Sequence, residues 1–206
     1  MVIAIDGPAG AGKSTVARAV AERLGFTYLD TGAMYRAVAL AAAGREYDAA
    51  GIAERADIRV GDRVLLDGRD VTDEIRTPEA SAGASRVAAD PGVRAALVRK
   101  QQEIVEDGDW VAEGRDIGSV VAPDAAVKVF LTADPQERAR RRAAQTGADP
   151  EQVLREQAER DERDATGERT VLEPATDAVP VDTTGLSLDE VVAQIEMLAT
   201  EARELR

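Results

Sequence analysis

The sequence predicts an α/β protein built on a five-stranded, parallel, doubly wound sheet. Short apolar runs typical of buried strands alternate along the chain with segments of helical periodicity. A glycine-rich turn follows the first apolar run and leads directly into a helical segment. Acidic residues close three of the expected strands, namely Asp6, Asp30 and Glu113. Because ligands of such sheets bind at the carboxyl ends of the strands, we expect a binding site at this edge.

The beginning of the chain predicts two strands and two helices. Residues 2–6 form a short, mostly β-branched run that ends at a turn rich in Gly and Pro. Residues 14–24 place apolar side chains three and four positions apart, and Gly25 follows as a helix-ending glycine. Residues 26–29 predict the second strand, and the second helix is expected to begin near Gly32.

Residues 47–91 combine short strand-like runs, turns and a helical segment, which predicts a small insertion on the main sheet. Two strand-like runs, 58–60 and 63–66, flank the hairpin signal Gly61-Asp62. The remaining signals are a turn at Asp67-Gly68 and a helix at 78–89.

The second half of the chain predicts three more strands that alternate with helices. Asp134 followed by Pro135 is a helix-start signal, and Ser187 with Glu190 predicts a capping box at the last helix. Two segments after Pro135 are dense in Arg and Glu, which predicts exposed helices. The expected elements are helix 93–105, strands 110–113 and 126–131, helices 135–144 and 150–164, strand 178–182 and helix 187–205.

The composition excludes several classes of protein. The 206 residues suffice for one well-buried domain. The absence of Cys and His excludes disulfide scaffolds, thiolate or His-ligated metal sites and His-dependent catalytic triads. A formal net charge of -13 disfavours binding to a nucleic-acid backbone. Because the chain has no bilayer-length apolar run and no signal-peptide pattern, we expect a cytoplasmic monomer with no nucleic-acid or membrane partner.

A phosphate-binding motif occupies residues 7–14, which read GPAGAGKS and match G-x-x-x-x-G-K-[ST]. In this loop, backbone N–H groups and the N-terminus of the following helix would surround phosphate oxygens. Lys13 is expected to reach the β- and γ-phosphates, and the Ser14 hydroxyl to ligate Mg²⁺. A glycine-rich turn with an incidental lysine is the alternative, which the flanking strand and helix disfavour. The expected ATP contacts are Gly7, Pro8, Ala9, Gly10, Ala11, Gly12, Lys13, Ser14 and Thr15.

Three classes of protein share this motif: GTPase switches, ATP-driven motors and kinases. Guanine recognition in GTPases uses an N-K-x-D motif, and the chain contains no Asn. A motor normally needs a larger chain with an oligomer-forming domain. A small ATP-dependent kinase is therefore the favoured interpretation, and its phosphate acceptor has to be recognised by other parts of the sequence.

Arginine and aspartate concentrate in four later stretches, each a candidate for the acceptor site. Arginine binds phosphate in a bidentate manner, and carboxylates accept hydrogen bonds from amino or hydroxyl groups. Gly114-Arg115-Asp116 is the strongest candidate because it directly follows a predicted buried strand. Arg36 could equally be a surface charge on a helix, and residues 160–164 a solvated ladder of ion pairs. The four stretches are 30–36, 85–94, 113–116 and 160–164.

Two motifs outside the phosphate loop carry a resemblance to a known family. Residues 30–36 read DTGAMYR and fit D-T-G-x-x-Y-R, and residues 114–118 read GRDIG and fit G-R-D-[IM]-G. With these motifs and the phosphate loop, the chain resembles the bacterial cytidylate kinases of the nucleoside monophosphate kinase superfamily over nearly its whole length. Further matches lie at residues 74–78, 87–88, 93–94, 123–125 and 160–161.

The resemblance implies a division of the chain into functional parts and an activity. The core would comprise residues 1–46, 92–134 and 165–206. An insertion at about 47–91 would bind the nucleoside monophosphate, and an Arg-rich lid would span about 135–164. The implied reaction is transfer of the γ-phosphoryl group of ATP to CMP or dCMP, with Mg²⁺.

The resemblance also implies roles for individual residues. Arg36 and Arg115 would hold the acceptor phosphate. The cytosine edge would be read by Ser85, Arg94 and Asp116. Thr31 would contact the acceptor, Asp164 would hold its sugar, and Arg160 would stabilise charge on the transferring group. The implied catalytic residues are Lys13, Arg115 and Arg160, and the implied CMP contacts are Thr31, Arg36, Ser85, Arg94, Arg115, Asp116, Arg160 and Asp164.

One position departs from the family pattern. Gly167 stands where an Arg is usual, and no role is assigned to Arg169 two residues later. Three alternatives stay open at this point: a small kinase for UMP, AMP or shikimate, a nucleotide-binding switch without enzymatic activity, and a structural protein that retains a decayed kinase fold.

Overall fold

The computed structural model describes residues 1–43, 48–166 and 172–205, without the side chains of residues 145, 160 and 163–166. Two units make up the chain: Met1–Tyr28 with Gly108–Arg206, and Leu29–Asp107. Each unit has its own hydrophobic core. Within the described ranges, no helix combines the length and the apolar character needed to cross a bilayer.

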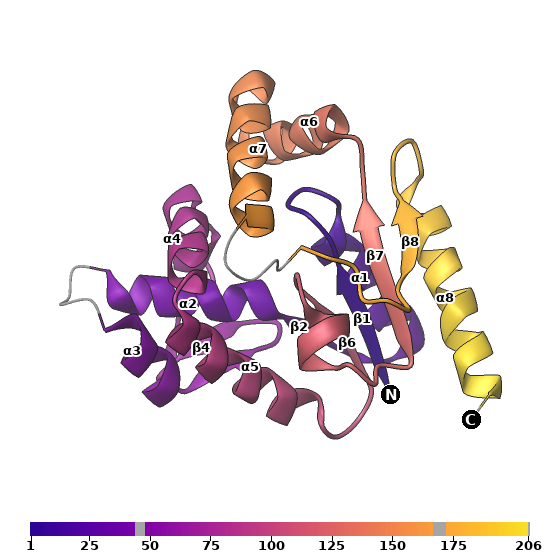
Figure 1. Ribbon diagram of the computed structural model, residues 1–206, viewed down its shortest axis with the longest axis horizontal. Helices are drawn as coiled ribbons and strands as arrows, with labels where there is room; N and C mark the ends of the chain where they lie inside the picture. Colours follow the sequence, from indigo (N-terminus) through magenta and orange to yellow (C-terminus); the bar gives the residue numbers. More distant parts are fainter. Residues whose placement is uncertain (44–47, 167–171, 206) are drawn as a thin grey trace. The chain divides into compact units, whose positions relative to one another are not determined.

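A five-stranded sheet forms the centre of the first unit, in the order β2-β6-β1-β7-β8. β1 pairs in parallel with β6 on one side and β7 on the other, and β8 continues in parallel from β7 (Figure 1). Most side chains of β1 and β7 are buried, which explains why their sequences are apolar without alternation. The predicted parallel α/β sheet is confirmed. The strands are β1 (Val2–Asp6), β2 (Thr27–Asp30), β6 (Trp110–Glu113), β7 (Val127–Thr132) and β8 (Val179–Asp182).

Helices α1 and α8 close the core of this unit. Val16 and Val20 of α1 and Val192 and Ile195 of α8 are buried in one cluster with side chains from the strands. The predicted capping box at the start of α8 is present, because the Ser187 and Glu190 side chains and backbones bond reciprocally. The helices are α1 (Lys13–Leu24), α6 (Pro135–Thr146), α7 (Pro150–Thr166) and α8 (Leu188–Glu204).

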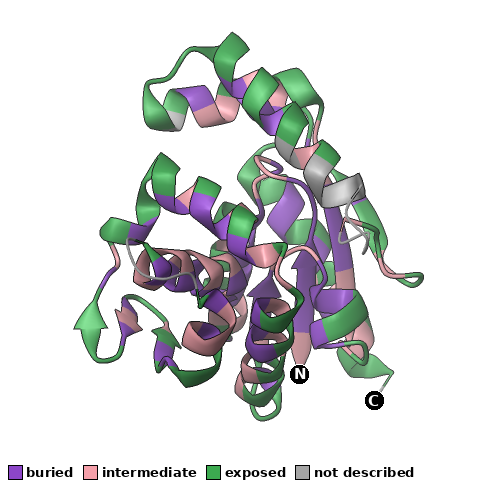
Figure 2. Ribbon diagram, turned by 60° about the vertical axis from the view of Figure 1, so that its left-hand side comes forward, coloured by how far each residue is buried: buried purple, intermediate pink, exposed green. Residues whose placement is uncertain are grey.

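Helices α6 and α7 form a pair with a small apolar contact of their own. Ala139, Ala143 and Val153 are buried together in this pair. Most of the other described side chains on the two helices are at least partly exposed (Figure 2). Asp134 caps the start of α6, as predicted. The pair therefore depends on polar contacts for much of its attachment to the rest of its unit.

The second unit combines helices with a three-stranded antiparallel sheet. The predicted hairpin at Gly61 is present, with Val60 opposite Val64, and β5 adds to the far side of β4. This unit contains the proposed insertion at 47–91 together with α2 and α5. Its elements are α2 (Thr31–Ala42), α3 (Ala49–Arg55), β3 (Ile58–Val60), β4 (Val64–Leu66), β5 (Arg69–Asp70), the 3₁₀ turn η1 (Glu74–Arg76), α4 (Pro78–Ala88) and α5 (Pro91–Val105).

Four elements were not predicted from the sequence: α3, β5, η1 and η2. The short helix α3 begins where the Asp48 carboxylate accepts a hydrogen bond from the N–H of Gly51, at 2.8 Å. The π-helical turn η2 spans Ile117–Val121 and is held at its start by Asp6, which lies 111 residues before Ile117. Since that partner is so distant in the chain, no local pattern could reveal the turn.

Candidate active site

The glycine-rich loop connects β1 to α1 and has a backbone that only glycine adopts readily. The φ angles of Gly7, Gly10 and Gly12 are 145°, 79° and 92°. A Cβ at Gly7 would lie 2.1 Å from the carbonyl oxygen of Leu131 in the neighbouring strand β7. The glycines of the predicted motif are therefore required by the curl of the loop and by its close approach to the sheet.

Lys13 and Ser14 open α1 at the end of this loop. The Lys13 side chain is buried, and its ammonium group donates to the carbonyl oxygen of Pro8 at 2.8 Å. The residue Ser14 is exposed, so its hydroxyl lies at an accessible helix N-terminus. The first turn of α1 contains no acidic residue, which leaves the positive end of the helix dipole unopposed. This combination suits a multiply charged anion.

The Ser14 hydroxyl is the kind of protein ligand that fits a magnesium ion carried by a nucleotide. Mg²⁺ in such sites is held by few protein ligands, and phosphate oxygens and water complete its coordination. Among the described residues, no group of three acidic side chains is arranged to hold a metal. The Ser14 hydroxyl is thus a suitable single protein ligand for an ion that arrives with phosphate.

The two arginine-rich helices contribute contacts to the loop that the sequence analysis did not identify. Arg138 of α6 donates to the carbonyl oxygens of Ala9 at 2.9 Å and Ala133 at 3.2 Å. It also forms an ion pair with Asp161 of α7 at 2.7 Å. The buried charge of Arg138 is paired with Asp161, so this arginine links α6 and α7 to the loop at Ala9.

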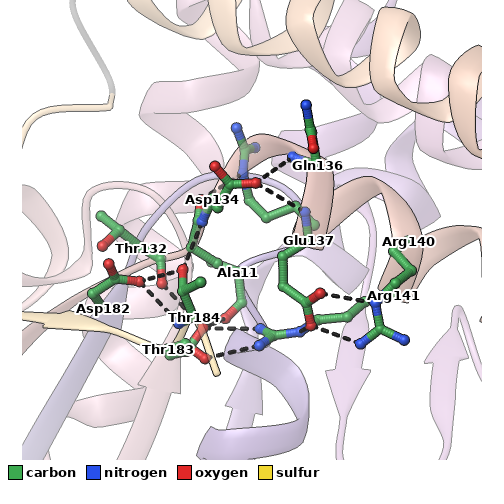
Figure 3. Close-up of polar contacts among 12 residues, drawn as sticks. Ala11, Thr132, Asp134, Gln136, Glu137, Arg140, Arg141, Asp182, Thr183 and Thr184 are labelled. Atoms are coloured by element: carbon green, nitrogen blue, oxygen red, sulfur yellow. Dashed lines mark hydrogen bonds and ion pairs between the residues drawn. The ribbon is translucent and has the colours of Figure 1, made fainter. Parts of the chain in front are cut away.

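Arg141, one helical turn further along α6, binds the loop that follows β8 (Figure 3). Its guanidinium donates to the Thr183 hydroxyl at 2.9 Å and to the Thr183 carbonyl oxygen at 2.8 Å. The Thr183 hydroxyl in turn lies 3.3 Å from the carbonyl oxygen of Ala11. Hydrogen bonds from Arg140 and Arg141 lower the pKa of Glu137 to about 2, so this carboxylate is charged at neutral pH.

The carbonyl oxygens of the phosphate loop are therefore occupied by the protein's own donors. Lys13 bonds the carbonyl of Pro8 and Arg138 that of Ala9. The Thr183 hydroxyl is shared between the carbonyl oxygens of Thr132 at 3.0 Å and Ala11 at 3.3 Å. Carbonyl dipoles held in this way do not turn toward an anion in the loop. The sequence showed only that residues 135–144 are rich in Arg, and nothing in it pointed to Thr183.

The Gly114–Asp116 segment lies at the same edge of the sheet as the loop. The N–H of Gly114 donates to the carbonyl oxygen of Ile5 at 3.0 Å, which ties the segment to the end of β1. Arg115 is half-buried and Asp116 is buried at the start of η2. The predicted residues Lys13, Arg115 and Asp116 thus all belong to one unit and one sheet edge.

Asp6 ends β1; the sequence analysis placed it at the binding edge of the sheet but gave it no role. Its carboxylate accepts hydrogen bonds from the N–H groups of Ile117 at 2.9 Å and Gly118 at 2.8 Å. Burial raises the pKa of Asp6 to about 6, although these two hydrogen bonds act in the opposite direction. The charge of Asp116 raises this pKa further and that of Lys13 lowers it.

Four other predicted acceptor residues lie in the second unit, namely Thr31, Arg36, Ser85 and Arg94. The Asp30 carboxylate caps α2 through the N–H of Ala33 at 2.9 Å and pairs with Arg36 at 2.8 Å. Thr31 is buried at the first position of this helix. Ser85 and Arg94 are partly buried on α4 and α5. Arg36 is therefore held by the carboxylate of Asp30, the residue that caps its helix, and is not an isolated surface charge.

The predicted lid residues lie partly outside the part of the chain that the structure describes. The side chains of Arg160 and Asp164 lie outside the described residues, as do Gly167 and Arg169. Their backbone positions at 160 and 164 belong to α7. Their implied contacts stay predictions.

Comparison with solved structures identifies the class of protein. The fold matches a gluconokinase from Sinorhizobium meliloti with a TM-score of 0.55 and 21% sequence identity, over 99% of this chain and 94% of that one. This match shows the fold alone, which with the glycine-rich loop between β1 and α1 is that of a P-loop α/β protein.

Sequence comparison identifies the family within that class. The family model for cytidylate kinase matches residues 3–201. A cytidylate kinase from Carboxydothermus hydrogenoformans is 51% identical over 95% of both chains. One from Solibacter usitatus is 52% identical over 93% of this chain and 88% of the relative. The chain belongs to the cytidylate kinase family, as the resemblance in its motifs implied.

Proposed function

We propose that the protein transfers the γ-phosphoryl group of ATP to CMP or dCMP, giving ADP and CDP or dCDP. The observation that carries this proposal is the Gly114–Asp116 segment bonded to the end of β1, beside a phosphate loop, in a chain of the cytidylate kinase family. The loop supplies the donor side of the reaction and the segment supplies groups suited to a phosphate acceptor.

On the ATP side, residues 7–15 bind the triphosphate through backbone N–H groups and the N-terminus of α1. The Lys13 ammonium group stays bonded to the Pro8 carbonyl oxygen and uses its other N–H donors to neutralise charge on the β- and γ-phosphates. Ser14 holds Mg²⁺, which supplies further neutralisation of the phosphates when bound. Because little covalent chemistry is required of the protein, these groups act by alignment and electrostatic stabilisation.

On the acceptor side, the arginines bind the CMP phosphate and polar groups read the base. Arg36 and Arg115 have the bidentate geometry suited to a phosphate, and their positive charge favours its dianionic form. The remaining acceptor contacts are assigned to Thr31, Ser85, Arg94, Asp116 and Asp164.

The helix pair α6–α7 acts as a lid that brings Arg160 to the transferring group. Its attachment to the loop through Arg138 gives a path by which nucleotide in the loop influences the pair. Closure expels water and so suppresses transfer of the phosphoryl group to water. Hydrogen exchange measured on α6 and α7 should slow when both substrates are present, and equal exchange in the free and doubly liganded enzyme would exclude this role.

An assay of ADP release with different acceptors tests the proposed function. The wild-type enzyme with ATP and Mg²⁺ is offered CMP, dCMP, UMP, AMP, GMP and shikimate. We expect kcat/KM for CMP or dCMP to exceed that for every other acceptor by about tenfold or more, because a site that hydrogen-bonds the cytosine edge rejects bases lacking its groups. A higher value with UMP, AMP or shikimate would assign the chain to another acceptor, and release of ADP that needs no acceptor would indicate an ATPase.

A further inference from the structure

Asp6, just before the phosphate loop, is bonded to the turn η2 that follows the Gly114–Asp116 segment. It is the last residue of β1 and immediately precedes Gly7, and only 5% of it is exposed. Both carboxylate oxygens are used, one by the N–H of Ile117 and the other by the N–H of Gly118. These two bonds hold the first turn of η2 against the end of β1.

The turn that Asp6 holds also fixes the backbone of Asp116. The N–H groups of Val120 and Val121 both donate to the Asp116 carbonyl oxygen, at 2.9 and 3.2 Å. A Cβ at Gly118 would lie 3.2 Å from the Lys128 side chain and 3.5 Å from an oxygen of Asp6. The turn is therefore packed closely against β1 and β7, and a shift of its first two N–H groups would displace the residues just before it.

We propose that Asp6 is a positioning residue for phosphoryl transfer: its carboxylate fixes Ile117 and Gly118, and through them directs Arg115 and Asp116 toward the acceptor. This inference rests on the proposed function, in which Arg115 and Asp116 contact CMP. Asp6 itself touches neither substrate in this scheme. It acts on the acceptor site more strongly than on the nucleotide in the loop.

The charges around Asp6 support a functional reason for a buried carboxylate at this position. Lys13 of α1 attracts its negative charge, and Asp116 repels it. Glu113 at the end of β6 is opposite Ile5 and accepts a hydrogen bond from the Tyr28 hydroxyl at 2.5 Å, and Lys128 on β7 is paired with Asp177. Burial disfavours the ionised form of Asp6, whereas the two N–H groups of the turn favour it.

The substitution Asp6→Asn tests the inference, because it keeps the shape of the side chain and removes one of its two acceptors. One of the two N–H groups of the turn then faces an amide NH₂. Loss of a hydrogen bond to a charged group corresponds to about 10- to 100-fold in affinity. We expect Asp6→Asn to weaken CMP binding and lower kcat by at least about tenfold, with the Kd for ATP within about threefold of wild type. Asp177→Asn removes an exposed carboxylate paired with Lys128 and is the matched control. It should leave CMP binding, kcat and the Kd for ATP unchanged.

Two further measurements separate positioning from general stability and keep the inference testable if the variant folds poorly. At about pH 7, where the raised pKa of Asp6 no longer adds to the stability of wild type, the melting temperature of Asp6→Asn should stay within a few degrees of wild type. In the wild-type protein without substrates, the amide ¹H and ¹⁵N shifts of Gly118 should titrate with the Asp6 carboxyl, and an amide that does not respond would overturn the proposed contact.

The outcomes distinguish this inference from the proposed function. Parallel loss of CMP and ATP binding with a lowered melting temperature would mean that Asp6 has only a structural role. A variant with wild-type CMP binding and kcat would overturn the inference alone. Failure of the wild-type enzyme to phosphorylate CMP, with a Gly118 amide that still titrates, would overturn the proposed function and with it the role of Asp6 in transfer.

Discussion

At the scale of single residues, Lys13 is the main cationic side chain of the phosphate loop. Its ammonium group is buried and donates to the Pro8 carbonyl, so it is already held at the place where phosphate would enter. An ordered positive charge of this kind stabilises developing negative charge without reorganisation.

Replacement of Lys13 by Ala should therefore lower kcat by about 10³-fold, because a preorganised donor to the transferring phosphate is lost. Steady-state kinetics with ATP and CMP checks this value, and circular dichroism checks that the fold is kept. Lys100→Ala is the control, since the Lys100 ammonium bonds the Ala56 carbonyl in the other unit. Turnover by Lys13→Ala close to that of the control would refute the assignment.

Arg115 and Arg86 provide a second comparison between arginines. Arg115 is half-buried at the sheet edge, whereas Arg86 is exposed on α4. Arg115→Ala should lower kcat/KM for CMP by about 100-fold because a bidentate phosphate contact disappears. Arg86→Ala should change it by less than about threefold, as surface substitutions commonly do. Equal effects in the same assay would argue against Arg115 as an acceptor residue.

At the scale of elements, the connection between β1 and α1 depends on glycine at position 7. Gly7→Ala would force a Cβ toward the Leu131 carbonyl at a φ angle of 145°. We expect it to lower the free energy of unfolding by about 2 kcal/mol or more and to weaken ATP binding, since the loop must move away from β7. Gly61→Ala is the matched control, because a Cβ there meets nothing within 4 Å.

Urea denaturation and calorimetric titration with ATP and Mg²⁺ check both effects of Gly7→Ala. A variant as stable as Gly61→Ala, with unchanged ATP affinity, would show that the loop does not need its close approach to the sheet.

Most elements of the fold could be predicted because their signals are local. The apolar run at Val2–Asp6 and the capping box at Ser187 and Glu190 each appear where the sequence placed them. Helix α3 was missed because its seven residues are too few to show a clear period. The turn η2 was missed because Asp6 stabilises it through contacts far apart in the chain.

The site was predictable to the extent that its residues belong to motifs. Lys13, Ser14 and Arg115 could be assigned from their spacing and from the strand or helix beside them. Arg138 and Thr183 could not, because their importance comes from backbone carbonyl oxygens that the fold brings to them. Sequence patterns therefore identify residues that contact a ligand more easily than they identify residues that hold those contacts in place.

At the scale of the whole molecule, the buried Asp6 makes stability depend on pH in an unusual direction. Its pKa rises from 3.8 to about 6 on folding, so the folded state binds the proton more tightly than the unfolded state. This contribution to stability is present below about pH 4 and is lost as pH rises through about 6. It corresponds to on the order of 3 kcal/mol.

The free energy of unfolding of wild type relative to Asp6→Asn should therefore fall as pH rises from about 4 to about 7. Chemical denaturation of both proteins at several pH values measures this difference. Exposed carboxylates with a lowered pKa, such as Glu137, act in the opposite direction in each protein and cancel in the comparison. A difference that is constant or rises with pH would contradict a raised pKa for Asp6.

The central claim concerns the whole molecule: the phosphate loop and the acceptor groups cooperate to move a phosphoryl group from ATP to CMP. The most direct measurement follows the label from ATP carrying ³²P in its γ position, incubated with the wild-type enzyme, Mg²⁺ and CMP. The account predicts that label appears in CDP in the same amount as ADP is formed. Label found only in inorganic phosphate, or remaining in ATP at saturating CMP, would contradict it.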